Sequence, residues 1–101
     1  MPVDLPTTTT PEVLLSDLRL FATAIDLGSL AAVGRATRLS KTSVTRQIQR
    51  LEAATGHRLL HRGNGRFALT EEGRELLVKI RGPLSAIDEA VVGLAGSASA
   101  L

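Results

Sequence analysis

The spacing of apolar positions changes along this chain, and four stretches carry the 3.6-residue period of a helix. The first stretch runs from Asp17 to Leu27, and Gly28 follows it as a C-terminal cap. A second helix is expected after Ser29, whose hydroxyl can cap free N–H groups. Gly34 lies inside this helix at a cost of about 1 kcal/mol relative to alanine. We therefore expect a neighbouring helix to approach closely there.

A third helix is predicted from Lys41 to Thr55, between a capping Ser40 and a terminating Gly56. One face of it is an apolar stripe at helical spacing, formed by Val44, Ile48 and Leu51. The other positions are polar or cationic: Lys41, Thr42, Ser43, Thr45, Arg46, Gln49 and Arg50. Most amphipathic helices are only scaffold. A helix with Arg, Gln, Thr and Ser on its free face nevertheless has the chemistry that major-groove readout needs.

After Gly56 the pattern becomes that of short strands. The segments 58–62 and 66–69 flank Gly63-Asn64-Gly65, and Gly and Asn tolerate the positive φ angles of a tight hairpin. In the second arm Phe67 and Leu69 should point one way, and Arg66 and Ala68 the other. Three helices followed by such a hairpin predict a mainly α fold, the winged helix-turn-helix, with arginine at the mouth of a two-stranded wing.

A fourth, long helix is predicted after a capping Thr70, with Glu71 and Glu72 in its first turn, where the helix dipole favours anions. Its apolar residues follow an a/d heptad pattern: Leu77, Ile80, Leu84, Ile87, Val91 and Leu94. Pro83, in a Gly82-Pro83 pair, should kink or divide this helix. Because the three-helix core has no room for the heptad seam, we expect the seam to pair with a second copy of the chain.

These elements predict a simple domain organisation. A Pro- and Thr-rich tail at 1–15 is expected to be disordered, a winged helix-turn-helix to occupy 16–70, a linker helix 71–96 and a second tail 97–101. The chain has 101 residues, which suffice for one small domain.

Charge is concentrated in the middle of the chain. Between Ser29 and Arg66 there are eight Lys or Arg residues and a single acidic residue, Glu52, although the net charge of the whole chain is only +2. Such asymmetry indicates a nucleic-acid or other anionic partner. Two Phe and no Trp or Tyr disfavour the base stacking of single-strand or RNA binders.

Other classes of protein are disfavoured by composition. The chain has no Cys, so it has neither disulfides nor thiolate metal sites, and no apolar run or leader indicates a membrane span or a signal peptide. We therefore expect a cytoplasmic protein. The histidines, His57 and His61, lack a third ligand or a carboxylate nearby in sequence, so neither a metal site nor an enzyme is predicted, and no cofactor is implied.

The order and spacing of several short motifs resemble the N-terminal domain and linker helix of LysR-type transcriptional regulators. The matching segments are Leu18-Arg19-Leu20-Phe21, Gly28-Ser29, Ser40 to Ile48, Leu51-Glu52, Leu59 to Arg62 and Leu69 to Gly73. Lys41-Thr42 replaces the family's usual Gln-Pro. Nothing after residue 96 could form the effector-sensing domain of the family, so the chain is either an excised fragment or a short member with no small-molecule effector site.

The resemblance implies sequence-specific binding of double-stranded DNA, with residues 41–55 in the major groove and the wing on the backbone or the minor groove. Residues expected to contact base edges are Lys41, Thr42, Thr45 and Arg46. Residues expected to contact the DNA backbone are Ser43, Arg50, Arg62, Arg66 and Thr70. Linker helices of the family pair antiparallel, which implies a homodimer through the heptad seam.

Two alternatives stay open at this point. Without an effector domain, the heptad helix could serve as an interaction module that dimerises with a full-length regulator. The chain could also be a differently regulated winged-helix repressor, for example one that responds to a metal oxyanion, although no ligand site in the sequence supports this.

Overall fold

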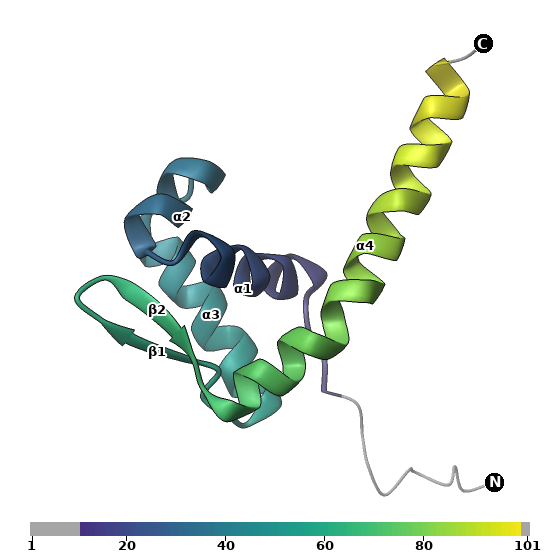
Figure 1. Cartoon of the computed structure of the whole chain (residues 1–101). Coiled ribbons are helices and arrows are strands. Elements are labelled where there is room, and N and C mark those ends of the chain that lie inside the picture. The colour runs from purple at the N-terminus through teal and green to yellow at the C-terminus, as the bar shows by residue number, and fades with distance from the viewer. Residues whose placement is uncertain (1–10, 100–101) are drawn as a thin grey trace, which may run out of the picture.

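The computed structural model describes residues 11–99 and contains four helices and one hairpin within that range. The elements in chain order are α1 (Leu15–Leu27), α2 (Leu30–Thr37), α3 (Lys41–Thr55), β1 (Leu60–Gly63), β2 (Arg66–Leu69) and α4 (Glu71–Ser99). Figure 1 shows α1, α2 and α3 gathered in one body, with the hairpin at its side and α4 extending away from it. The predicted winged helix-turn-helix followed by a long helix is confirmed.

Most of the predicted helix boundaries are confirmed by their caps. Gly28 and Gly56 end α1 and α3 in the left-handed conformation, with φ of 81° and 76°. The hydroxyls of Ser29 and Ser40 accept hydrogen bonds from Ala32 N and Ser43 N, both at 3.1 Å. These contacts lie within one turn, which is why local sequence predicts them.

The start of α1 differs from the prediction by two residues. The helix begins at Leu15 rather than Asp17, because the carbonyl of Leu14 accepts from the N–H groups of Asp17 and Leu18. Val13, ahead of the helix, packs against the core, so part of the predicted tail 1–15 is ordered. The rest of that tail, residues 1–10, lies outside the described residues, as do residues 100–101 of the predicted tail 97–101.

The turn between α2 and α3 corrects the reason given for Gly34. A Cβ at Gly34 would lie 3.3 Å from the carbonyl oxygen of Leu39, so the close neighbour is the turn itself and not another helix. Arg38 ends α2 with φ of 60°. An L residue in this region costs about 1–2 kcal/mol, and its N–H donates to the carbonyl of Gly34 at 2.8 Å.

The predicted hairpin is confirmed, although its first strand is Leu60–Gly63 rather than 58–62, and Leu60 pairs with Leu69 and Gly63 with Arg66. Its turn has positive φ at both Asn64 and Gly65, 55° and 75°, which matches a type I′ turn.

A third segment pairs with this hairpin and was not predicted. Phe67 N donates to the carbonyl of Gly28 at 3.0 Å, and Leu30 N donates to that of Gly65 at 2.8 Å. The junction between α1 and α2 thereby runs along the edge of β2 and fixes the wing to the helical body.

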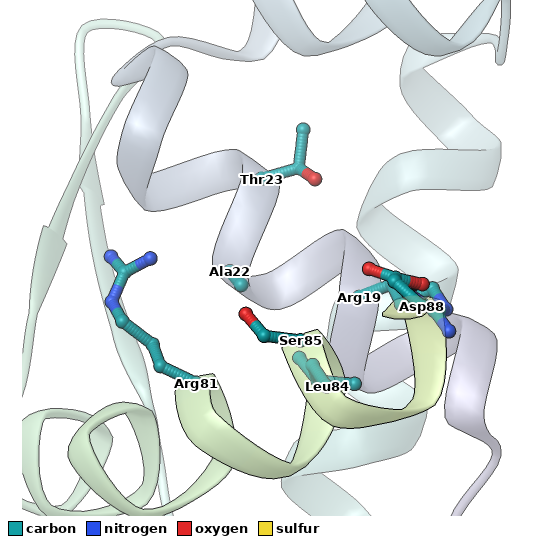
Figure 2. Close-up of a pocket in the computed structure, with 7 residues that line it drawn as sticks. All are labelled: Arg19, Ala22, Thr23, Arg81, Leu84, Ser85 and Asp88. Atoms are coloured by element: carbon teal, nitrogen blue, oxygen red, sulfur yellow. Dashed lines mark hydrogen bonds and ion pairs between the residues drawn. The ribbon is translucent and has the colours of Figure 1, made fainter. Parts of the chain in front are cut away.

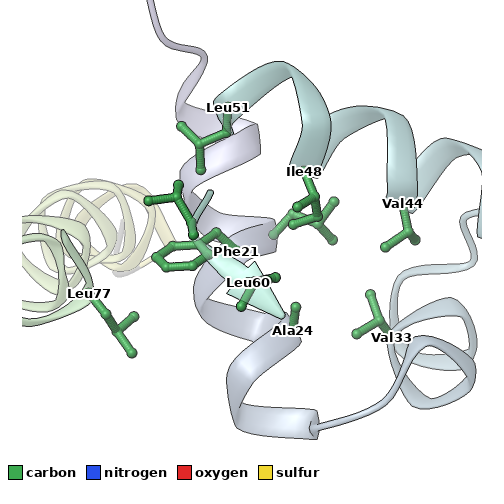
Figure 3. Packing of buried hydrophobic residues seen from close by; sticks show 10 residues of the cluster. Phe21, Ala24, Val33, Val44, Ile48, Leu51, Leu60 and Leu77 are labelled. Carbon is green, nitrogen blue, oxygen red and sulfur yellow. The ribbon is translucent and has the colours of Figure 1, made fainter. Parts of the chain in front are cut away.

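The core forms where three helices, the wing and the start of α4 meet (Figure 3). Its buried members come from every element except β2: Leu20, Phe21, Ala24, Val33, Val44, Ile48, Leu51, Leu59, Leu60 and Leu77. The predicted stripe of α3 is therefore confirmed as the side that faces the core.

The first turn of α4 is held against the wing. Gly73 is buried, and a Cβ there would lie 2.1 Å from the carbonyl oxygen of Leu59. No side chain other than hydrogen fits that approach. Glycine at this position therefore lets the backbone at Leu59, just before β1, pass close to the beginning of α4.

The remainder of α4 runs without a break through Pro83 to Ser99, past the predicted end at residue 96. Pro83 therefore does not divide the helix, and Figure 1 shows α4 changing direction between its first turns and its distal part. Two ion pairs join α4 to α1, Arg81 with Asp26 at 2.8 Å and Arg19 with Asp88. Figure 2 shows Leu84 and Ser85 between them, facing α1.

The predicted dimer seam is divided by this docking into a part that packs within the chain and a part that stays exposed. Leu77 and Leu84 are only 6% and 8% exposed, and Ile80 packs against the core, so these three residues serve the fold of the single chain. Ile87, Val91 and Leu94 remain 40%, 63% and 75% exposed. Sequence spacing could not reveal this division, because α1 and the core cover the proximal part of α4.

Candidate nucleic-acid interface

The four residues predicted to contact base edges lie together on α3. Lys41, Thr42, Thr45 and Arg46 line one shallow depression, which they share with Gln49. The depression lies on the side of the helix away from Val44 and the core. None of its side chains forms an ion pair or a side-chain hydrogen bond with another described residue. Two cations, two hydroxyls and one amide are therefore free to meet a ligand.

Ser43 lies beside this depression, at the N-terminal end of α3. Its hydroxyl oxygen is 3.1 Å from that of Ser40, and its N–H donates to the same capping oxygen. The Ser43 side chain is partly buried. The hydroxyl has hydrogen-bonding capacity left for an anionic oxygen, as was expected of a backbone contact.

Arg50, predicted to contact the DNA backbone, is paired with an acid of the same chain, although its side chain is 51% exposed. Its Nε and Nη2 donate to the two carboxylate oxygens of Asp17 at 2.7 and 2.8 Å. Asp17 is 1% exposed, so its carboxylate depends on this bidentate partner. The hydrogen bond to Asp17 raises the pKa of Arg50, and the negative charge of Asp17 adds to this effect. Arg50 therefore anchors α3 to the first turn of α1.

Arg62 is held in a similar way by Glu52. One oxygen of the Glu52 carboxylate accepts from the N–H groups of Leu59 and Leu60 at 2.8 and 3.2 Å. The other lies 3.6 Å from Nη2 of Arg62. Arg62 is partly buried, and its Nε has no hydrogen-bond partner among the described residues. The single acid of the basic block thus ties α3 to the wing, a role that the sequence did not reveal.

Thr70 was also predicted to contact the DNA backbone, but its hydroxyl is engaged within the protein. Thr70 is buried, its hydroxyl donates to the carbonyl of Arg58 at 2.6 Å, and its oxygen accepts from Gly73 N at 2.9 Å. The second bond confirms it as the cap of α4. A hydroxyl with both roles filled inside the protein has no free surface for a phosphate.

Arg66 keeps the arrangement expected of a wing contact. It lies at the turn end of β2, opposite Gly63, with an exposed side chain and no ion pair to a described residue. Three further arginines of the basic block, which were not assigned a role from sequence, are also exposed and pair with no acid in the described part of the chain: Arg35, Arg38 and Arg58. The exposed cations of the basic block that have no acidic partner among the described residues thus lie on α2, on the turn after it, on α3 and in and next to the wing.

The two histidines are both exposed, His57 between α3 and β1 and His61 on β1. In the described part of the chain no three His, Asp or Glu side chains are grouped so that they could hold a metal ion. None of the described helices is both long and apolar enough to cross a membrane.

Comparison with known proteins places this geometry in a family. The sequence pattern of bacterial regulatory helix-turn-helix proteins of the lysR family matches residues 15–74. An HTH-type transcriptional regulator from Xanthomonas campestris pv. campestris is 42% identical over 59 residues, which cover 58% of this chain and 17% of that protein.

Two solved structures show the same architecture. The full-length virulence activator AphB of Vibrio cholerae, a member of the LTTR family, matches with a TM-score of 0.76 and 28% identity over 81% of this chain and 28% of AphB. The CbnR DBD, solved in complex with DNA, matches with a TM-score of 0.73 and 29% identity over 88% of this chain and 100% of that domain.

The family pattern extends from the first residue of α1 to the first turn of α4 and includes every element that forms the exposed face of α3 and the wing. It covers more than half of the chain, and the architecture agrees with that of the solved relatives. This protein therefore belongs to the lysR family of bacterial regulatory helix-turn-helix proteins.

Proposed function

We propose that this chain binds double-stranded DNA in a sequence-specific manner, with α3 in the major groove and the wing against the backbone or the minor groove. The observation that carries the proposal is the surface depression of Lys41, Thr42, Thr45 and Arg46, whose side chains have no partner among residues 11–99. An α-helix fits the major groove, and these side chains can donate to or accept from base edges there. Arg46 can form a bidentate pair with guanine.

The backbone contacts in this proposal differ from those expected from sequence. Arg66 on the wing and Ser43 beside the depression contact phosphate, and Arg35, Arg38 and Arg58 add positive charge around them. Arg50 and Arg62 hold α3 and the wing in position through Asp17 and Glu52. The related CbnR DBD, solved in complex with DNA, supports DNA binding by this chain.

The family consists of transcriptional regulators and is not a family of enzymes. The chain spans only 17% of the length of its Xanthomonas relative. We propose that it acts in regulation of transcription, in the cytoplasm and without catalytic activity, as a homodimer whose interface is the exposed distal part of α4 with Ile87, Val91 and Leu94.

The same exposed residues favour a second function, pairing of α4 with a full-length regulator. This interaction module would not need the free cations of α3 and the wing. Duplex binding by the chain alone therefore separates the two functions.

The test is a titration of duplex DNA with the full chain at several salt concentrations. The logarithm of the affinity should fall linearly with the logarithm of salt, with a slope of about −0.9 for each phosphate neutralised. Arg46→Ala should weaken the preferred site by about 1–3 kcal/mol and relax preference at one base pair. A parent chain whose affinity does not depend on salt between low and physiological ionic strength would refute DNA binding.

A further inference from the structure

The depression on α3 contains one residue that was not assigned a role from sequence, Gln49. Its side chain is exposed beside Thr45 and Arg46, and its amide forms no hydrogen bond with any described residue. Gln47, two residues earlier on the same helix, lies elsewhere. It lines a separate depression with Arg19, Thr23 and other residues of α1 and the turn. Two identical side chains on α3 thus face different surroundings.

The chemistry of Gln49 differs from that of its neighbours in the depression. A glutamine amide presents one donor and one acceptor side by side, which matches the N6 and N7 pattern of adenine in the major groove. Lys41 and Arg46 offer only donors, which match guanine. The amide also carries no charge, so it would displace no counterion from the phosphates. Gln49 is therefore suited to base recognition rather than to general affinity.

The position of Gln49 on the helix sets the base pair that it can reach. It follows Arg46 by three residues on the same face, which corresponds to a rise of about 4.5 Å along the helix at 1.5 Å per residue. Stacked base pairs of B-DNA are about 3.4 Å apart. The two side chains are therefore offset by a length comparable to one or two base-pair steps, which favours contact with neighbouring base pairs.

We propose that Gln49 is a specificity-determining residue that reads an adenine one or two base pairs from the guanine read by Arg46. This inference rests on the proposed DNA binding by α3. It extends the recognition face from four residues to five and from the N-terminal half of α3 towards its C-terminal half.

The experiment selects binding sites from random duplexes with the full chain and with three variants, Arg46→Ala, Gln49→Ala and Gln47→Ala. The base pair at which Arg46→Ala loses guanine locates Arg46 on the site. Gln49→Ala should then lose an adenine preference of about 5- to 100-fold at one or two base pairs from that position. The salt slope of Gln49→Ala should equal that of the parent, because no charge is removed.

Gln47→Ala is the matched control and should leave every base preference unchanged. Unchanged selection by Gln49→Ala, with the Arg46 position still defined, would overturn the role of Gln49 and leave the proposed function intact. Equal relaxation by Gln47→Ala and Gln49→Ala would also overturn it, since the effect would then come from α3 as a whole. A parent that selects no consensus, while the salt dependence persists, would refute specific recognition altogether.

Discussion

At the scale of single residues, acidic partners decide what each arginine does. Arg50 and Arg62 occur in the same basic block as Arg46 and Arg66, yet Asp17 and Glu52 engage the first two. Asp17 is buried and would be costly to leave ionised without a partner. The side chains of Arg46 and Arg66 have no such acid within the described residues and stay available to a ligand.

Replacement of Arg50 and of Arg66 by alanine should therefore have opposite consequences. Arg50→Ala leaves the Asp17 carboxylate buried and unpaired, so the midpoint of urea unfolding should fall while the salt slope of DNA binding changes little. Arg66→Ala removes an exposed side chain, so stability should stay within about 0.5 kcal/mol of the parent and the salt slope should decrease by about one. If Arg50→Ala instead lowered the slope and kept full stability, Arg50 would be a phosphate contact.

At the scale of elements, the contact between Leu59, the residue before β1, and the first turn of α4 depends on the absence of a side chain. Gly73 lies under the carbonyl of Leu59, whereas Gly82, further along the same helix, has no atom within 4 Å of a Cβ built there. Both glycines lie in α4, but only at Gly73 do neighbouring atoms leave no room for a larger side chain. Substitution of these two glycines therefore separates the effect of packing on stability from the effect of helix propensity.

Gly73→Ala should destabilise the protein by about 1–3 kcal/mol, because either the backbone at Leu59 or the helix must move away. Gly82→Ala should stabilise it by up to about 1 kcal/mol through better helix propensity. Urea or thermal unfolding followed by circular dichroism measures both. Two variants of equal stability would show that the wing adjusts to a methyl group without cost.

At the scale of the whole molecule, α4 has two parts with different roles. Its proximal part packs on the core and on α1 through Leu77 and Leu84, with the Arg81 and Asp88 ion pairs on either side of Leu84. Its distal part stands clear of the body in Figure 1 and exposes Val91 and Leu94. An exposed apolar surface of this kind is typical of a binding surface.

Val91→Glu should therefore prevent dimerisation without unfolding the chain. Sedimentation should show a monomer, and a duplex with two half-sites should lose its advantage over a duplex with one, an advantage of about 10²- to 10⁴-fold where linked binding is effective. Val78→Glu is the control, since Val78 is 74% exposed on the proximal part of α4. A Val91→Glu dimer, or a parent that is monomeric on the two-half-site duplex, would place the interface elsewhere.

The sequence by itself determined the elements and their chemistry. Ser29, Ser40 and Gly56 bound the helices, and Asn64-Gly65 defines the hairpin turn, because caps and turns involve atoms within a few residues of each other. The apolar period of α3 likewise determined which side faces the core, and therefore that Lys41, Thr42, Thr45 and Arg46 share the exposed side. The order and spacing of the family motifs added the resemblance to a known family of DNA-binding proteins.

Only the tertiary structure decided which polar and apolar side chains are free. Asp17 reaches Arg50 from another helix, Thr70 reaches the carbonyl of Arg58, and α1 covers Leu84, and no local pattern encodes these pairings. Periodicity assigns a residue to a face, but its availability depends on what packs against that face. Heptad spacing therefore looks the same for a residue buried within its own chain and for one that awaits a partner.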